Sequence, residues 1–295
     1  MVGFDAAEQS RDALRLGATL AAAEGAELQV AAVLPRARLP FEEAIAGGQL
    51  AEQLDEQLDG QLFDSAASAL GSAKFTPVKL DGGLAGGRSA ARALYEHAGE
   101  QHADLIVVGS SHRGKLGRVL PGSVGESLLR GAPCAVAVAP RGYARTEQPS
   151  IRLIGVAYDG SEEAKLALAE AERLARAFGA RLEVITVVPV RPAADIVLEA
   201  DIVLEADLAG ELGQALRHEY QHRLDEATSA LARETSPEGA LEEGDPVAIL
   251  AKRASKLDLL VMGSRGYGPI RSALLGGISA QVIRAASCPV LVTRR

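Results

Sequence analysis

The chain has 295 residues, of which 47% are hydrophobic and 24% are charged, and its formal net charge is −8. This is the composition of an ordinary globular protein, and the length favours about two domains of ~150 residues each. The acidic balance disfavours binding to nucleic acid, and no apolar run reaches the ~18 residues that a membrane span needs.

The N-terminus lacks the charged start and apolar core of a signal peptide. The two cysteines, Cys134 and Cys288, lie in apolar contexts that look like strands, which favours buried thiols over a disulfide framework. We therefore expect a cytoplasmic protein that does not contact membranes.

In the first half of the chain, the expected strands are 1–4, 28–34, 77–81, 105–108 and 135–139, and the expected helices are 8–23, 49–72, 89–101 and one that begins at 123. In the second half, the expected strands are 151–158, 182–188, 240–243, 259–262 and 290–293, and the expected helices are 162–178, 207–235, 247–256 and 278–286. Strands that alternate with helices in this way predict a parallel sheet covered on both faces.

The two halves match when one is shifted by 154 positions, so that Asp5 aligns with Asp159. A repeat of this length is a duplicated domain and not a solenoid unit. The polar segment 141–150 separates the halves, and we expect domains at 1–142 and 150–295. The sequence therefore predicts an α/β protein with two tandem, doubly wound, Rossmann-like parallel-sheet domains.

The first strand of the first half is shorter than its counterpart. Met1 aligns with Gly155, so the opening residues of a central strand are missing from the first half. We expect the natural start of the protein to lie upstream of Met1.

A glycine-rich loop follows the fourth expected strand of each half. The second half spaces its glycines as G-x2-G-x9-G-G, at Gly263, Gly266, Gly276 and Gly277. Strand, glycine loop and helix start is the order in which α/β proteins bind phosphates, because glycines let the backbone approach the anion and free N–H groups at a helix N-terminus point at it.

This spacing resembles the G-x2-G-x9-G-[S/T] signature of the universal stress protein family, whose members with that signature bind ATP. The resemblance covers nearly the whole chain, twice, and implies an adenine nucleotide alpha hydrolase-like fold. In that family the aspartate after the first strand and a residue near the end of the second hold adenine, and the glycine loop with the following Ser/Thr holds ribose and phosphates. Carried over to this chain, the nucleotide-binding residues are Asp159, Val187, Gly263, Gly266, Gly276, Gly277 and Ser279 in the second half, and Asp5, Val33, Gly109, Gly122 and Ser123 in the first.

Both halves depart from the family pattern. Gly277 replaces the hydroxyl residue, which removes a side-chain donor to phosphate worth roughly 1.5–3 kcal/mol, so we expect weaker binding there. In the first half His112 replaces the second glycine, where its side chain either obstructs ribose and phosphate or hydrogen-bonds to them. The alternative for all these glycines is that they serve only as tight turns.

The resemblance implies a regulatory stress-response protein that binds ATP, ADP or AMP, with or without Mg²⁺, and has little or no catalytic activity. It also implies that the two domains pair within the chain through the last strands, 135–139 and 290–293, and that the protein forms a homodimer. Two alternatives remain open: an interaction scaffold that has lost nucleotide binding, and a hydrolase. The sequence does not indicate a signalling partner.

Two short motifs could serve the hydrolase alternative. His218 and His222 belong to an H-E-x-x-H match, but a third zinc ligand would have to come from one of three glutamates, Glu238, Glu242 or Glu243, and nothing selects one. The segment 109–116 nearly matches a Walker A loop, but Leu116 replaces the Ser/Thr that ligates Mg²⁺ and Pro121 delays the next helix. We therefore interpret the first motif as a polar stripe on an outer helix and expect no metal site.

Overall fold

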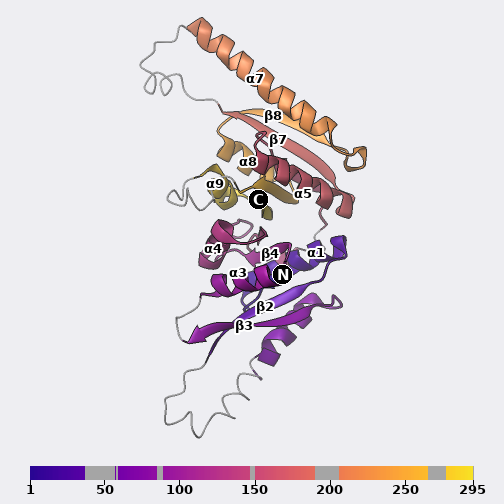
Figure 1. Ribbon diagram of the computed structural model, residues 1–295, viewed down its shortest axis with the longest axis vertical. Coiled ribbons are helices and arrows are strands. Elements are labelled where there is room, and N and C mark those ends of the chain that lie inside the picture. Colours follow the sequence, from indigo (N-terminus) through magenta and orange to yellow (C-terminus); the bar gives the residue numbers. More distant parts are fainter. Residues whose placement is uncertain are drawn as a thin grey trace. The chain divides into compact units, whose positions relative to one another are not determined.

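The computed structural model describes residues 1–36, 57, 59–84, 89–146, 150–189, 206–264 and 277–294. The chain divides into two compact units, one that begins at Met1 and one that begins at Ser150. In Figure 1 the first unit runs from indigo to magenta and the second continues through orange to yellow.

The first unit contains a parallel sheet in the strand order β3-β2-β1-β4-β5. Its strands are β1 (Val2–Gly3), β2 (Gln29–Arg36), β3 (Thr76–Leu84), β4 (Leu105–Gly109) and β5 (Ala135–Ala139). The chain runs outward from β1 to β3 and then returns to β4 on the other side of β1, so the strand order reverses between β1 and β4. In doubly wound sheets ligands bind beside such a reversal, at the carboxyl ends of the strands.

Helices cover both faces of this sheet: α1 (Glu8–Glu24), α3 (Ala90–Glu100) and α4 (Ser123–Gly131), with a further helical stretch at residues 59–70. Helix α1 packs on β1, β4 and β5, whereas α3 packs on β2 and β3 and against α4. Crossovers between parallel strands are right-handed, so crossovers that run in opposite directions place α1 and α3 on opposite faces.

The second unit repeats this arrangement with the strand order β8-β7-β6-β9-β10, again parallel throughout. Its strands are β6 (Leu153–Ala157), β7 (Arg181–Pro189), β8 (Glu238–Gly244), β9 (Leu259–Gly263) and β10 (Val290–Thr293), and its helices are α5 (Glu162–Phe178), α7 (Ala206–Ser229), α8 (Pro246–Ala254) and α9 (Ile278–Ala285). The predicted fold of two tandem, doubly wound α/β domains is therefore confirmed.

The strands beside the reversal supply the centre of each core. Leu259 and Leu260 of β9 are fully buried, and so is Ile106 of β4. Full burial of one such side chain contributes about 1.5–3 kcal/mol, so these near-continuous apolar strands fix the sheet on which the loops are carried.

The third strand of each unit is longer than its apolar pattern predicts. The predicted strands 77–81 and 240–243 extend in the structure over all of β3 and β8. Both lie at an edge of their sheet, where backbone pairing with β2 or β7 defines the strand and the polar side chains face solvent. An alternation of apolar and polar residues therefore underestimates their length.

The predicted helix 207–235 is interrupted in the structure, because α7 ends at Ser229 and a short 3-10 turn, η2, covers Arg233–Thr235. The backbone N–H of Ala232 donates to the Glu172 carboxylate at 2.8 Å instead of continuing the helical ladder.

The first strand is also shorter than predicted, since β1 covers two residues. No helix in the described ranges is both long and apolar enough to cross a membrane.

Candidate functional site

A cavity of about 320 Å³ lies at the carboxyl ends of β1, β2 and β4 in the first unit. All five residues predicted for this half line it: Asp5, Val33, Gly109, Gly122 and Ser123. They come from three strand ends and one helix start, separated by up to about a hundred residues of sequence. The parallel sheet brings them together because its strands end at the same edge.

Asp5 lies in the turn between β1 and α1. Its Oδ1 accepts the backbone N–H of Ala7 at 3.0 Å, and its own N–H donates to the Ser10 hydroxyl at 3.3 Å. The exposed carboxylate keeps further acceptor capacity, since each oxygen offers two lone pairs. Ala6, which lies between Asp5 and Ala7, adopts a left-handed backbone with a φ of 62°, a conformation that favours glycine.

Gly109, at the end of β4, is required by packing. A Cβ atom at this position would lie 1.9 Å from the carbonyl oxygen of Gln9 in α1. The equivalent Gly263 is also confined, because its Cβ would lie 2.8 Å from the backbone of Glu163 in α5. These two glycines therefore let the first helix of each unit cross the strand end at close range, a reason distinct from both a tight turn and a ligand contact.

Gly122 differs from Gly109 in this respect. A Cβ atom on Gly122 would meet nothing closer than 3.8 Å, and its φ of −78° suits any residue. It is the N-cap of α4, where no side chain caps the helix, and Ser123, Val124 and Gly125 of the first turn line the cavity. The N–H groups of such a first turn have no partners within the helix and form an anion-binding end.

The loop between β4 and α4 is held closed by a buried serine. Ser110 is 2% exposed, its hydroxyl donates to the carbonyl of Ala139 at 2.7 Å, and it accepts the N–H of Leu120 at 3.2 Å. The N–H of Ser111 donates to the carbonyl of Leu120 at 2.6 Å, which brings the two ends of the loop together. The helix that follows begins only at Ser123, so the delayed start that distinguishes this loop from a Walker A loop is confirmed.

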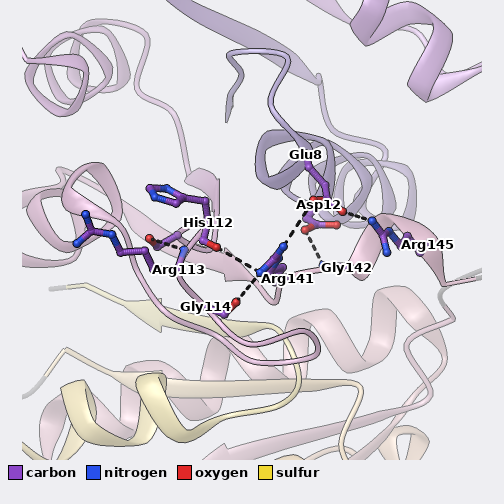
Figure 2. Close-up of polar contacts among 9 residues, drawn as sticks. Glu8, Asp12, His112, Arg113, Gly114, Arg141, Gly142 and Arg145 are labelled. Atoms are coloured by element: carbon purple, nitrogen blue, oxygen red, sulfur yellow. Dashed lines mark hydrogen bonds and ion pairs between the residues drawn. The ribbon is translucent and has the colours of Figure 1, made fainter.

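Arg141, just after β5, clamps the same loop from outside. Its Nη1 donates to the carbonyl oxygens of His112 at 3.2 Å and Gly114 at 2.9 Å, as Figure 2 shows. The His112 imidazole points away from Arg141 and belongs to the cavity lining. The predicted choice between obstruction and hydrogen bonding at His112 thus concerns a residue that lines the cavity.

Asp12 of α1 anchors the residues that follow Arg141. The carboxylate is 1% exposed and accepts the N–H groups of Gly142 at 2.8 Å and Ala144 at 2.7 Å. Burial raises the pKa of the Asp12 carboxyl, an effect that the two backbone donors partly offset. Nearby, Glu8 forms an ion pair with Arg145. No sequence pattern predicts the roles of Asp12 and Arg141, because their partners are backbone groups far away in the chain.

In the second unit the described members of the predicted set lie at corresponding positions. Asp159 follows β6, where its Oδ1 accepts the N–H of Ser161 at 3.0 Å and the hydroxyl of Ser161 at 2.5 Å. Gly160 between them has a φ of 80°, and Ser161 caps α5. Val187 is half-buried near the end of β7. The unit therefore repeats the strand-end aspartate and its turn.

The loop after β9 is described only at its ends, and Gly266 and Gly276 lie outside the described residues. Gly263 ends β9, and Gly277 is the N-cap of α9 without a side-chain cap. Ser279 is buried, and its hydroxyl donates to the carbonyl of Gly263 at 3.5 Å. That long contact joins the start of α9 to the end of β9.

The H-E-x-x-H match lies on α7. His222 is mostly exposed, and its Nδ1 lies 3.6 Å from Oε2 of Glu226. Glu219 pairs with Arg223. The three glutamates considered as third ligands pair with arginines: Glu238 with Arg181, Glu242 with Arg253 and Glu243 with Arg217. Within the part of the chain that the structure describes, no group of three His, Cys, Asp or Glu residues could hold a metal ion.

Neither cysteine forms a disulfide bond, as the sequence predicts, and the predicted burial holds for Cys288 but only in part for Cys134. Cys134 is half-buried and Cys288 is buried, and burial raises the pKa of the Cys288 thiol to about 12. A thiol of this kind packs as a small apolar side chain and is inert as a nucleophile.

Two doubly wound units, each with a glycine loop beside the strand reversal, place the chain in the class of tandem α/β proteins with a cleft at the carboxyl edge of the sheet. The model of the universal stress protein family matches residues 1–140 and 150–294. The chain belongs to the universal stress protein family, as the glycine spacing predicts.

Relatives agree with this assignment. A universal stress protein of Mycobacterium tuberculosis strain H37Rv is 33% identical over 195 residues, which cover 65% of this chain and 62% of the relative. The match thus spans less than two thirds of that relative's length. A universal stress protein of Thermus aquaticus is 35% identical over 145 residues, which cover 48% of this chain and 98% of the relative.

Solved structures share the fold over the whole chain. A universal stress protein from Archaeoglobus fulgidus DSM 4304 aligns with a TM-score of 0.65 at 21% identity, covering 100% of this chain and 98% of the other. A functionally unknown protein from Pseudomonas aeruginosa PAO1 aligns with a TM-score of 0.61 at 16% identity, covering 99% of this chain and 91% of the other. At these identities the likeness concerns the fold alone.

Proposed function

We propose that this stress-response protein binds an adenine nucleotide, ATP or its products ADP and AMP, and acts as a nucleotide-dependent regulator and not as an enzyme. The observation that carries the proposal is the cavity of the first unit, in which all five predicted residues converge on one edge of the sheet. Its volume of about 320 Å³ falls in the range of small-molecule sites.

The phosphates are assigned to the N-terminus of α4. The first-turn N–H groups of Ser123, Val124 and Gly125 have no acceptor within the helix, and the helix dipole favours negative charge there. Gly122 leaves the space in front of these donors open although the fold itself would accept a side chain. Packing does not require a glycine at position 122, whereas a close approach of phosphate to the backbone does.

The adenine ring is assigned to the other end of the cavity. Asp5 has acceptor capacity left for an exocyclic amine or a ribose hydroxyl, and the half-buried Val33 offers an apolar surface for the ring. Mg²⁺, where present, would be bound mainly through the phosphates, as is usual for this cation.

We propose a second, weaker site in the second unit. Asp159, Val187 and Gly277 hold the positions of Asp5, Val33 and the residue after Gly122, and the α9 N-terminus lacks a side-chain cap. Gly277 supplies only its backbone N–H, so the affinity there should be lower by about one side-chain hydrogen bond to phosphate.

A regulatory role is consistent with the hydrogen bonds that hold the loop between β4 and α4. Ser110 and Arg141 tie the loop to the end of β5, so a ligand in the cavity would act on a loop that is already fixed to the domain's last strand. We further propose a cytoplasmic location, which two cysteines without a disulfide bond suit, and a homodimer, which sedimentation velocity would test.

The proposal is tested first by the nucleotide content of the purified protein. The protein is denatured, the supernatant is separated by ion-exchange chromatography, and stripped protein is then titrated with ATP in a calorimeter. One or two sites per chain with micromolar affinity, or about −8 kcal/mol, are expected. Neither bound nucleotide nor heat of binding would overturn the proposal and favour the protein-binding scaffold.

A matched pair of variants assigns the site. Gly122→Asp places a good helix cap and a negative charge where the phosphates are proposed to lie, so the number of ATP sites per chain should fall by one. Gly131→Asp makes the same change at the other end of α4, where a Cβ meets open space, and should leave the number unchanged. An unchanged site count in Gly122→Asp would remove the site from the first unit.

A further inference from the structure

A second cavity, of about 530 Å³, lies against a different face of α1. Its wall includes positions 8, 11, 12 and 15 of the chain, which share one face of a helix, whereas the nucleotide cavity touches α1 at positions 9 and 10. The two cavities of the first unit are therefore separated by the helix itself.

The acidic side chains in the wall of this second cavity already have partners. Glu8 pairs with Arg145, and the carboxylate of Asp12 accepts two backbone N–H groups. The charge of Glu8 is therefore paired, and the two oxygens of Asp12 are occupied as acceptors by the segment after β5, which includes Gly142 and Ala144.

Two arginines in the same wall have no such partner. Arg11 and Arg15, one turn apart on α1, make no side-chain hydrogen bond or ion pair with any other residue that the structure describes. The Nε of Arg15 is buried and lacks an acceptor among the described residues. Like charges at this spacing repel each other, and a buried donor without an acceptor is unfavourable, so both features call for an anion.

Among the other described residues of the wall, Arg145 is cationic and pairs with Glu8, and the rest are apolar. Leu14 and Ala144 line the cavity, and Ala69 closes it from the helical stretch 59–70. Guanidinium groups recognise phosphate through paired N–H donors, and the side chains of Arg11 and Arg15 have such donors without an acceptor among the described residues.

We propose that this cavity binds a small phosphate monoester with an apolar body, whose phosphate lies between the guanidinium groups of Arg11 and Arg15. The site belongs to the first unit alone, because its aligned positions in the second unit are Lys165 and Ala169. It is independent of the nucleotide proposal, since it shares no lining residue with the other cavity.

The test uses phenyl phosphate as the probe and calorimetry on the full chain. Replacing both arginines (Arg11→Gln with Arg15→Gln) should weaken binding of phenyl phosphate at least tenfold, or about 1.4 kcal/mol. The control, Lys165→Gln with Arg176→Gln, removes the same charge from exposed positions of α5 and should bind as the wild type does.

A second pair of variants leaves the arginines in place. Ala69→Glu puts a carboxylate into the cavity wall from an exposed position and should abolish binding, while Ala67→Glu, exposed on the same helical stretch, should not. Far-UV circular dichroism and an unchanged urea-unfolding midpoint would show that each variant is folded.

The proposal is overturned if wild-type protein takes up no phenyl phosphate at millimolar concentration. It is also overturned if the double arginine variant binds as tightly as its control, which would place the probe elsewhere. Loss of binding in the arginine and Ala69 variants, with both controls binding as the wild type does and all variants folded, supports it.

Discussion

The carboxylate of Asp12 accepts the backbone N–H of Ala144 at 2.7 Å across 132 positions of sequence, and thereby fixes the end of the first unit to its first helix. From the same terminal segment, Arg141 donates to two carbonyl groups of the glycine loop. The loop, the segment after β5 and α1 are therefore one hydrogen-bonded assembly (Figure 2). A substitution in α1 that breaks these hydrogen bonds should therefore also alter the position of the glycine loop.

The first prediction concerns the pH dependence of this anchor. Because burial raises the Asp12 pKa above its ordinary 3.8, the folded state holds this proton more tightly than the unfolded state does. The stability that the protonated group contributes is fully present below about pH 3.8 and is lost as the pH rises through the higher folded pKa.

The measurement compares urea unfolding of the wild type and Asp12→Asn from pH 3.5 to 7. Asn leaves one buried N–H without an acceptor, so the variant should be less stable by roughly 1–3 kcal/mol at neutral pH. The wild-type advantage should be larger at the acidic end. An advantage that grows with pH would show that the sign is wrong.

The second prediction concerns the turn before α1. Ala6 has a φ of 62° where the second unit has Gly160 with a φ of 80°. A left-handed backbone costs a residue with a side chain roughly 1–2 kcal/mol, and glycine gives back part of this through its unfolded-state entropy. Ala6→Gly should therefore stabilise the protein by about 0.5–1 kcal/mol in urea unfolding.

Its control is Ala22→Gly, at an exposed position in the last turn of α1. That change should destabilise the protein by about 0.5–1 kcal/mol, the ordinary cost of glycine in a helix. If both variants lost stability equally, the left-handed turn would not be a source of strain.

The third prediction separates packing glycines from permissive ones. Gly109→Ala would place a methyl group 1.9 Å from the Gln9 carbonyl oxygen, and Gly263→Ala would collide with the backbone of Glu163. Each should destabilise the protein by roughly 3 kcal/mol, since the helix must move away from the strand. Gly131→Ala, where a Cβ meets open space, should leave stability unchanged or raise it by up to about 1 kcal/mol. Thermal and urea unfolding of the three variants decide the matter, and equal stabilities would contradict the packing argument.

The fold could be predicted because its signals are local and repeated. Apolar runs such as Leu259–Met262 and helices that stop at Gly25 and Gly179 mark each element, and the duplication presents every mark twice. The edge strands were underestimated because backbone pairing defines them more than side-chain pattern does. The break after Ser229 depends on Glu172, a partner 60 positions away that no local pattern reveals.

The candidate site divides in the same way. Asp5, Val33 and Gly122 could be placed at one edge because parallel strands end together there, and the structure brings them into one cavity. The reason for Gly109 could not be read from spacing, since a turn, a ligand and a crossing helix all favour glycine. Asp12 was missed because its acceptor role depends on the distant N–H groups of Gly142 and Ala144.

The fourth prediction concerns the two thiols. Cys288 is 4% exposed, and burial raises its pKa to about 12, whereas Cys134 is half-buried. Because the thiolate is the nucleophile, iodoacetamide should modify Cys134 first and reach Cys288 only after unfolding, as mass spectrometry would show.

Above about pH 9, an unfolded Cys288 loses its proton while the folded one keeps it, so this residue should lower the free energy of unfolding by roughly 1.4 kcal/mol per pH unit. Cys288→Ala should lack this part of the alkaline slope, and a variant with the wild-type slope would mean that the thiol is not protected.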